Sequence, residues 1–342
     1  MIPSFSKLLR AAVMSLAALA LPAVLLHASA GAAAEPAFAP LSALSLKSSA
    51  ALVMDQQSGE TLYGKNIDVV HPMASITKLM TAMVTLDANL DPNEVISVAD
   101  EDVDVLRNSS SRLRVGASAT REEMLRLALM ASENRAASAL ARTYPGGRAN
   151  FIVAMNRKAQ MLGLAGTHYD DPTGLSSTNV STAEDLGRLV RAAHQYDKIR
   201  EFTTTARYVA TVSGRPMQFH NTNRLVDSPG WDIGLSKTGF INEAGRCLVM
   251  QAKLAGRAVV IVLLDSFGTY TRVADATRIR NWLEVASGYA NPVRVAGGGS
   301  HPRAAHASVR PVAMRVSSRR TVAHVHSTRR HLTVAPSARR PA

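Results

Sequence analysis

Residues 71–87 read HPMASITKLMTAMVTLD, and this stretch decides how the rest of the chain is interpreted. Its apolar residues recur at helical spacing: Leu79, Met80, Met83, Val84 and Leu86. Ser75 stands where this helix begins, and Lys78 follows three residues later, one turn along the same face. The stretch therefore predicts a helix that presents a hydroxyl and an amine side by side.

Strand patterns occur on both sides of this helix in the sequence. Residues 49–54 and 61–63 flank a polar turn as a hairpin, and later strands are predicted at 207–213, 232–237, 247–253 and 258–265. Helices are predicted between them and at the end: 124–130 after a capping box at Thr120, 134–143, 150–162, 181–195 with a second box at Ser181, and 269–286. We therefore expect one α+β domain, with an antiparallel sheet from both chain ends and an inserted helical region.

The two ends of the chain differ from its body in charge. The 342 residues carry 39 Lys and Arg against 26 Asp and Glu, but residues 1–34 and 291–342 contain no acid. Residues 35–290 are therefore nearly neutral, and the 46% hydrophobic content of the chain predicts a folded body. No run after the first segment reaches the roughly 18 apolar residues of a spanning helix, which excludes a polytopic membrane protein.

Residues 1–34 have the pattern of a secretory signal peptide. Two cations precede an apolar run over residues 11–26, and small residues follow, so that cleavage after Ala30 or Ala34 fits equally well. An uncleaved membrane anchor is the alternative, which the shortness of the run disfavours. We expect an exported, periplasmic protein whose single cysteine, Cys247, forms no internal disulfide and is a small core residue.

Three short motifs follow one another in the body: Ser75-Ile76-Thr77-Lys78, Ser132-Glu133-Asn134 and Lys237-Thr238-Gly239. Each motif alone is common by chance, and ordinary helix caps, turns and surface charges would explain it. Their order and surroundings carry more weight. The second motif lies between two helical patterns, and the third ends a predicted strand, where a glycine lets a substrate backbone approach closely.

Together the motifs resemble those of the penicillin-binding serine DD-peptidases, the low-molecular-mass D-alanyl-D-alanine carboxypeptidases and endopeptidases of peptidase family S11. The resemblance covers residues 48–286 and includes four further segments: 71–74, 171–175, 220–223 and 237–245. It implies a β-lactamase/DD-peptidase-like fold for residues 35–290. Family carboxypeptidases usually carry a second, β-rich domain after the catalytic one. Here only a basic tail follows, so the likeness is closest to the single-domain endopeptidases of the penicillin-binding protein 7 type.

The first two motifs supply the groups for nucleophilic catalysis. A serine hydroxyl needs a base within hydrogen-bond reach, so Ser75 is expected to be the nucleophile and Lys78 its base. Burial and a second cation, Lys237, would keep Lys78 partly neutral. We expect Ser132 to relay a proton to the leaving amine and Asn134 to hold Lys78 and the substrate amide.

The third motif is expected to bind the substrate. Lys237 would attract its carboxylate, and Thr238 would donate a hydrogen bond, beside Gly239. The resemblance implies an oxyanion hole formed by the backbone N–H groups of Ser75 and Phe240, whose donors typically contribute about 3–4 kcal/mol each. This chemistry requires no metal and no other cofactor.

We therefore expect a penicillin-sensitive D-alanyl-D-alanine endopeptidase, which cuts peptide crosslinks of peptidoglycan through an acyl-enzyme on Ser75 and is inhibited covalently by β-lactams. A carboxypeptidase would use the same residues and is the first alternative. A β-lactamase needs a further base, for which Glu184 is the nearest candidate, although a capping box explains Glu184 better. A non-catalytic wall-binding protein is the alternative from another class.

Residues 291–342 are expected to form a disordered basic tail, with ten arginines, five histidines and no acid. Such a tail favours anionic polymers. Export makes nucleic acid an unsuitable partner, which leaves peptidoglycan carboxylates or envelope phosphates. A tail without a specific partner is equally compatible with the sequence, and His324-Val325-His326 is a weak metal-binding candidate.

Overall fold

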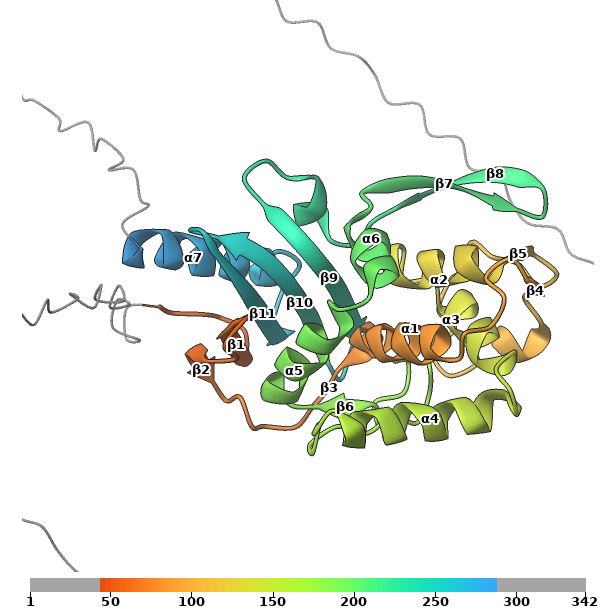
Figure 1. Cartoon of the computed structure of the whole chain (residues 1–342), viewed down its shortest axis with the longest axis horizontal. Helices are drawn as coiled ribbons and strands as arrows, with labels where there is room; N and C mark the ends of the chain where they lie inside the picture. Colours follow the sequence, from red (N-terminus) through yellow and green to blue (C-terminus); the bar gives the residue numbers. More distant parts are fainter. Residues whose placement is uncertain (1–43, 288–342) are drawn as a thin grey trace, which may run out of the picture. The chain divides into compact units, whose positions relative to one another are not determined.

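Strands from the two ends of the chain lie side by side in one antiparallel sheet, in the order β2-β1-β11-β10-β9 (Figure 1). The computed structural model describes residues 44–287, so the expected signal peptide and basic tail lie outside the described residues. The strands are β1 (Ala50–Asp55), β2 (Thr61–Lys65), β9 (Asp232–Ile241), β10 (Gly245–Leu254) and β11 (Arg257–Ser266). Ala50 of β1 pairs with Leu264 of β11, which confirms the predicted sheet.

The central strands read as nearly continuous apolar runs because both faces of the sheet are buried. Along β1, Leu52 and Met54 belong to the core shared with the inserted helices, whereas Ala51 and Val53 belong to the core on the opposite face. Side chains of a strand point alternately to its two faces, so each central strand serves both cores. Cys247 is fully buried, as expected of a small core residue.

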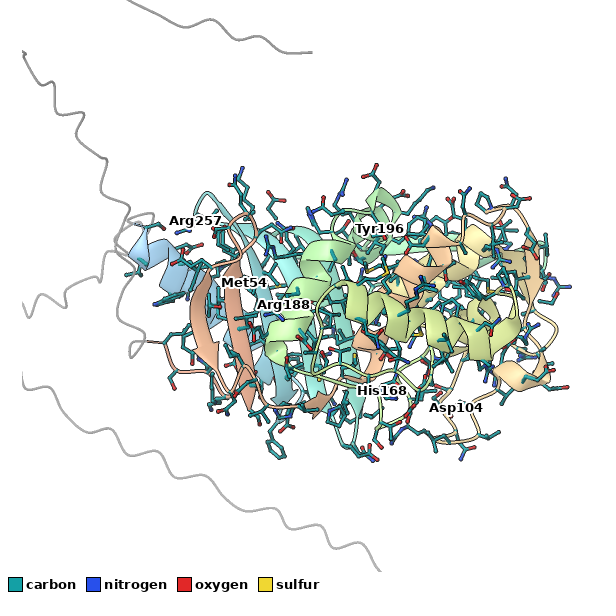
Figure 2. The ribbon with its side chains drawn as sticks, turned by 60° about the horizontal axis from the view of Figure 1, so that its bottom comes forward. Met54, Asp104, His168, Arg188, Tyr196 and Arg257 are labelled. Carbon is teal, nitrogen blue, oxygen red and sulfur yellow. The ribbon has the colours of Figure 1, made fainter. Side chains whose placement is uncertain are left out.

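Helices cover both faces of the sheet. Helix α7 (Thr271–Ala286) packs on β10 and β11 through Ile279 and Trp282, and α5 (Ala183–Ala193) packs on the other face. Gly187 allows a very close approach of α5, because a Cβ there would lie 2.6 Å from a methyl carbon of Leu52. Figure 2 shows Met54 beside the part of α5 that carries Arg188.

The remaining elements form the helical region next to the sheet (Figure 1). Its helices are the 3-10 helix η2 (Ala74–Thr77), α1 (Lys78–Asp87), η3 (Asp100–Asp102), α2 (Arg121–Met130), α3 (Asn134–Arg142), α4 (Gly147–Met161), α6 (Asp197–Thr204) and η4 (Arg224–Asp227). Three short strand pairs complete it: β3 (His71–Pro72) with β6 (Val180–Ser181), β4 (Val95–Ser97) with β5 (Ser118–Thr120), and β7 (Arg207–Val212) with β8 (Arg215–His220). Within residues 44–287, no helix has the length and apolarity needed to cross a membrane.

Local predictions were wrong at three places. The first helix opens with a 3-10 turn over residues 74–77 instead of beginning as an α-helix at Ser75. At α5 the capping residue is Thr182, whose hydroxyl accepts the Asp185 N–H, because the hydroxyl of Ser181 is paired with that of Thr167. The predicted strand end at Lys237-Thr238-Gly239 lies inside β9. The cap at Thr120 is confirmed, since its hydroxyl accepts the Glu123 N–H.

Candidate active site

The amine of Lys78 lies 2.8 Å from the hydroxyl oxygen of Ser75. Helix η2 carries Ser75 at its second residue and α1 begins at Lys78, so one short stretch of backbone fixes both groups. Lys78 is only 1% exposed. Its amine also donates hydrogen bonds to the side-chain oxygen of Asn134, at 2.7 Å, and to the carbonyl oxygen of Thr173, at 2.6 Å.

These contacts fix the direction in which the lone pair of a neutral Lys78 amine points. When the amine is neutral, its two N–H bonds are used by Asn134 and Thr173, and the remaining position faces Ser75. Burial lowers the pKa of Lys78 from 10.5 to about 7, against the opposing charges of Asp171 and Glu133. A substantial fraction of neutral lysine is therefore present near neutral pH, as a base for Ser75 requires.

The expected influence of a second cation falls on Lys237 instead of Lys78. Burial lowers the pKa of Lys237 well below its ordinary value, and the positive charges of Lys78 and Arg272 add to this effect. For Lys78 the cause of the lowering is burial alone, because the neighbouring carboxylates act in the opposite direction. Both expected causes are therefore present, but the Coulombic one lowers the pKa of Lys237 and not that of Lys78.

The second motif forms a strained turn between α2 and α3. Ser132 has a φ of 58°, in the left-handed region that residues with a Cβ seldom adopt. This turn directs the Ser132 hydroxyl towards the sheet, 2.9 Å from the amine of Lys237. The amide nitrogen of Asn134 donates to the hydroxyl of Ser109, at 3.0 Å, which leaves its oxygen turned towards Lys78.

The third motif lies on the edge strand β9 and faces this turn. Lys237 and Thr238 are buried although they are polar, and the Thr238 hydroxyl donates to the hydroxyl of Thr222, at 2.7 Å. A Cβ on Gly239 would lie 2.9 Å from the Met73 carbonyl oxygen and 3.1 Å from the Ser75 nitrogen. Glycine is therefore needed for β9 to pass so close to Ser75.

The structure thus brings together seven of the eight predicted site residues. Six of them contribute side chains and Gly239 contributes its backbone: Ser75, Lys78, Ser132, Asn134, Lys237, Thr238 and Gly239. The side chain of the eighth, Phe240, is 51% exposed and lies beneath the guanidinium of Arg246. Only its backbone N–H, one residue beyond Gly239, is in keeping with an oxyanion-binding role. Within residues 44–287, no three His, Cys, Asp or Glu side chains are arranged to hold a metal.

A loop that the motifs do not include completes the surroundings of Lys78. One carboxylate oxygen of Asp171 accepts the backbone N–H groups of Thr173 and Gly174, and the other accepts that of Ser176. This turn aims the Thr173 carbonyl at Lys78. Gly174 has a φ of 80°, and a Cβ on it would overlap the Ala74 carbonyl. The Asp-Pro-Thr-Gly sequence is a turn signal, but a backbone acceptor leaves no signal of its own.

Glu184, the nearest candidate for a deacylating base, has a structural role. It lies in the first turn of α5 and forms an ion pair with Arg188, with 2.7 Å between their charged atoms. Pairs of this kind, four residues apart on an exposed helix face, give modest helix stabilisation. The predicted cap of this helix was wrong by one residue, because Thr182 and not Ser181 is the cap. The position of Glu184 in the first turn of α5 still explains this residue.

Known proteins that are similar to this chain in sequence and in structure are D-alanyl-D-alanine peptidases and a DD-transpeptidase. A family described as D-alanyl-D-alanine carboxypeptidase matches residues 35–268. The D-alanyl-D-alanine endopeptidase of Pseudomonas aeruginosa is 51% identical over 251 residues, 72% of this chain and 80% of that protein. Its namesake from Escherichia coli is 46% identical over 241 residues, 70% and 78% of the two chains. The Streptomyces K15 DD-transpeptidase structure superposes with a TM-score of 0.66 at 33% identity, covering 70% of this chain and 98% of that one.

Proposed function

Because the chain belongs to the D-alanyl-D-alanine carboxypeptidase family, peptidase family S11, we propose that it is a serine DD-peptidase that cleaves D-alanyl peptide crosslinks of peptidoglycan. The observation that carries this proposal is the environment of Lys78. Its amine is buried, lies 2.8 Å from the Ser75 hydroxyl, and has no carboxylate of residues 44–287 within hydrogen-bond distance. A lysine in these surroundings acts as a base near neutral pH.

Acylation begins when the Ser75 oxygen attacks the carbonyl carbon of a D-alanyl residue and Lys78 takes the hydroxyl proton. The backbone N–H groups of Ser75 and Phe240 stabilise the oxyanion. The C–N bond then breaks, and the amine leaves with a proton that Ser132 supplies. Lys237 lies 2.9 Å from Ser132 and can replace that proton. Water subsequently attacks the Ser75 ester; its hydroxyl group joins the acyl carbon, its proton passes to the Ser75 oxygen, and the shortened peptide leaves. Exchange with solvent then removes the proton from Lys78 and returns one to Lys237.

Two of the relatives support an endopeptidase over a carboxypeptidase. Both of those quoted above carry the name D-alanyl-D-alanine endopeptidase. A carboxypeptidase remains the second candidate, because family members at 32–35% identity are named D-alanyl-D-alanine carboxypeptidase. A β-lactamase is disfavoured because Glu184, its candidate base, is engaged with Arg188 on helix α5.

Two measurements test the proposal. Incubation with a labelled penicillin should modify the wild-type protein stoichiometrically and persistently, whereas Ser75→Ala should not be labelled. Digestion of purified crosslinked muropeptide dimers should yield monomers without release of free D-alanine. Free D-alanine without loss of dimers would identify a carboxypeptidase, and rapid turnover of the penicillin would identify a lactamase.

The proposal also assigns roles to residues 1–34 and 291–342, which lie outside the described residues. The sequence pattern of residues 1–34 supports cleavable export to the periplasm, and residues 35–290 would then form the catalytic domain. The basic composition of residues 291–342 supports contact with anionic envelope polymers. N-terminal sequencing of the secreted protein tests cleavage after Ala30 or Ala34. Binding to wall sacculi at low and moderate salt, with and without residues 291–342, tests the tail.

A further inference from the structure

A basic hollow lies between the segment of residues 111–117 and the β7–β8 hairpin. Its volume is about 630 Å³, and three arginines line it: Arg112, Arg114 and Arg215. No acidic side chain contributes to its lining. We call this hollow the arginine groove.

The guanidinium groups of the groove are available to a ligand. Arg112, Arg114 and Arg215 are exposed, and none of them takes part in an ion pair within residues 44–287. Arg112 is oriented by its hydrogen bond to the Gln218 carbonyl and lies over the Phe219 ring, 4.6 Å from its centroid. Unpaired positive charges gathered around a hollow attract anions.

Both walls of the arginine groove continue into the catalytic motifs. On one side, the Ser111 hydroxyl and the Arg112 N–H donate to the carboxylate of Glu133, at 2.6 and 3.2 Å, and Glu133 immediately follows Ser132. On the other side, β8 runs from Arg215 at the groove to His220, and Thr222, two residues further, contacts the Thr238 hydroxyl through its own. The Glu133 contacts therefore place Ser111 and Arg112, at one end of the groove, next to the turn that carries Ser132.

We propose that the arginine groove binds the carboxylates of the leaving peptide strand in crosslinked peptidoglycan. This inference rests on the proposed endopeptidase function. Ser132 donates its proton to the leaving amine, so the leaving strand passes on the side of Ser132, next to the turn that Ser111 and Arg112 contact. A stem peptide carries several free carboxylates, and guanidinium groups bind carboxylates through paired hydrogen bonds. We expect a penicillin or a short uncharged peptide to end before the groove.

The test compares charge reversals in the groove with one at a distant site. The variants Arg114→Glu and Arg215→Glu change exposed groove residues. Arg157→Glu changes an exposed arginine of α4 that forms no ion pair with the other residues that the structure describes. KM and kcat are measured for muropeptide dimers with free carboxylates and for the same dimers after amidation. The rate of acylation by penicillin reports whether the fold and the reacting groups are intact.

Each groove variant is expected to raise KM for free-carboxylate dimers about tenfold, with kcat and penicillin acylation unchanged and Arg157→Glu without effect. Amidated dimers should show the raised KM already with the wild-type protein, and no further rise in the variants. An unchanged KM, or an equal rise with amidated dimers, would overturn the proposal.

Direct binding separates this inference from the proposed function. If the wild-type protein reacts with penicillin but cleaves no dimers, the endopeptidase function fails. Calorimetric titration of Ser75→Ala with the free-carboxylate dimer then tests the groove alone. Weaker binding after Arg215→Glu in that background supports it. Equal binding, or weakening only for a phosphate polymer used in place of the dimer, contradicts it.

Discussion

Arg107 and Glu243 form an ion pair, with 2.9 Å between their charged atoms, that joins the helical region to the turn between β9 and β10. Arg107 also donates to the Leu175 carbonyl, in the loop that presents Thr173 to Lys78. One guanidinium group therefore bridges the Leu175 loop and the β9–β10 turn, which are far apart in the sequence.

Removal of this guanidinium should loosen the site. We expect Arg107→Ala to lower the second-order rate constant of penicillin acylation several-fold, because the bonds to Glu243 and Leu175 are both lost. Glu243→Gln removes only the ionic contact, between partly exposed groups, and should have a smaller effect. Stopped-flow acylation kinetics distinguish the two. Equal losses in both variants would show that the ion pair, and not the Leu175 contact, is what matters.

The pH dependence of acylation should report the state of Lys78. Because burial lowers its pKa to about 7, the acylation rate should rise with pH through about 7 as the neutral base forms. Glu133→Gln removes a negative charge that raises this pKa, so its profile should be displaced to lower pH. The matched control is Glu184→Gln, which lies on α5 and should leave the profile unchanged.

Folding stability should also depend on Lys78. Its pKa is lower in the folded state than in the unfolded one, so the unfolded state binds more protons between about pH 7 and pH 10.5. The burial penalty is fully present below pH 7 and is relieved as pH rises. Urea unfolding at several pH values should show the wild type gaining stability relative to Lys78→Met from pH 6 to pH 9. A constant difference would contradict the assigned shift.

Gly239 should be indispensable for rate but not for folding. A Cβ at this position meets the Met73 carbonyl and the Ser75 nitrogen at 2.9 and 3.1 Å, so Gly239→Ala displaces β9 from the nucleophile. We expect acylation to fall by about a hundredfold, comparable to the loss of one oxyanion donor. Thermal unfolding should shift by only a few degrees. Unimpaired acylation would refute the need for this close approach.

The sequence predicts the parts of this fold that depend on side-chain pattern. The apolar runs identify the central strands, and the spacing of Ser75 and Lys78 predicts their contact. The misplaced strand end at Lys237 has a physical reason: polar side chains usually mark an exposed end, but here Lys237 and Thr238 are buried and face Ser132 and Thr222.

Contacts made by backbone atoms and by distant loops leave little trace in the sequence. The Thr173 carbonyl that accepts from Lys78 belongs to a backbone group that every residue has. Similarly, no local pattern reveals that Arg107 reaches Glu243 across more than a hundred residues. The near-complete burial of Lys78, which sets its pKa, arises only when α3, the Thr173 loop and η2 are assembled.

The pairing of Ala50 with Leu264 has a consequence for how the molecule matures. A nascent chain cannot complete its sheet until β11 has been synthesised, because the neighbour of the first strand is the last one. Pairings so distant along the polypeptide are slow to form. Until they form, β9 has no sheet to join and Ser132 has no Lys237 opposite it, so hydrolytic competence requires synthesis through β11, and termination before that strand yields an inert fragment.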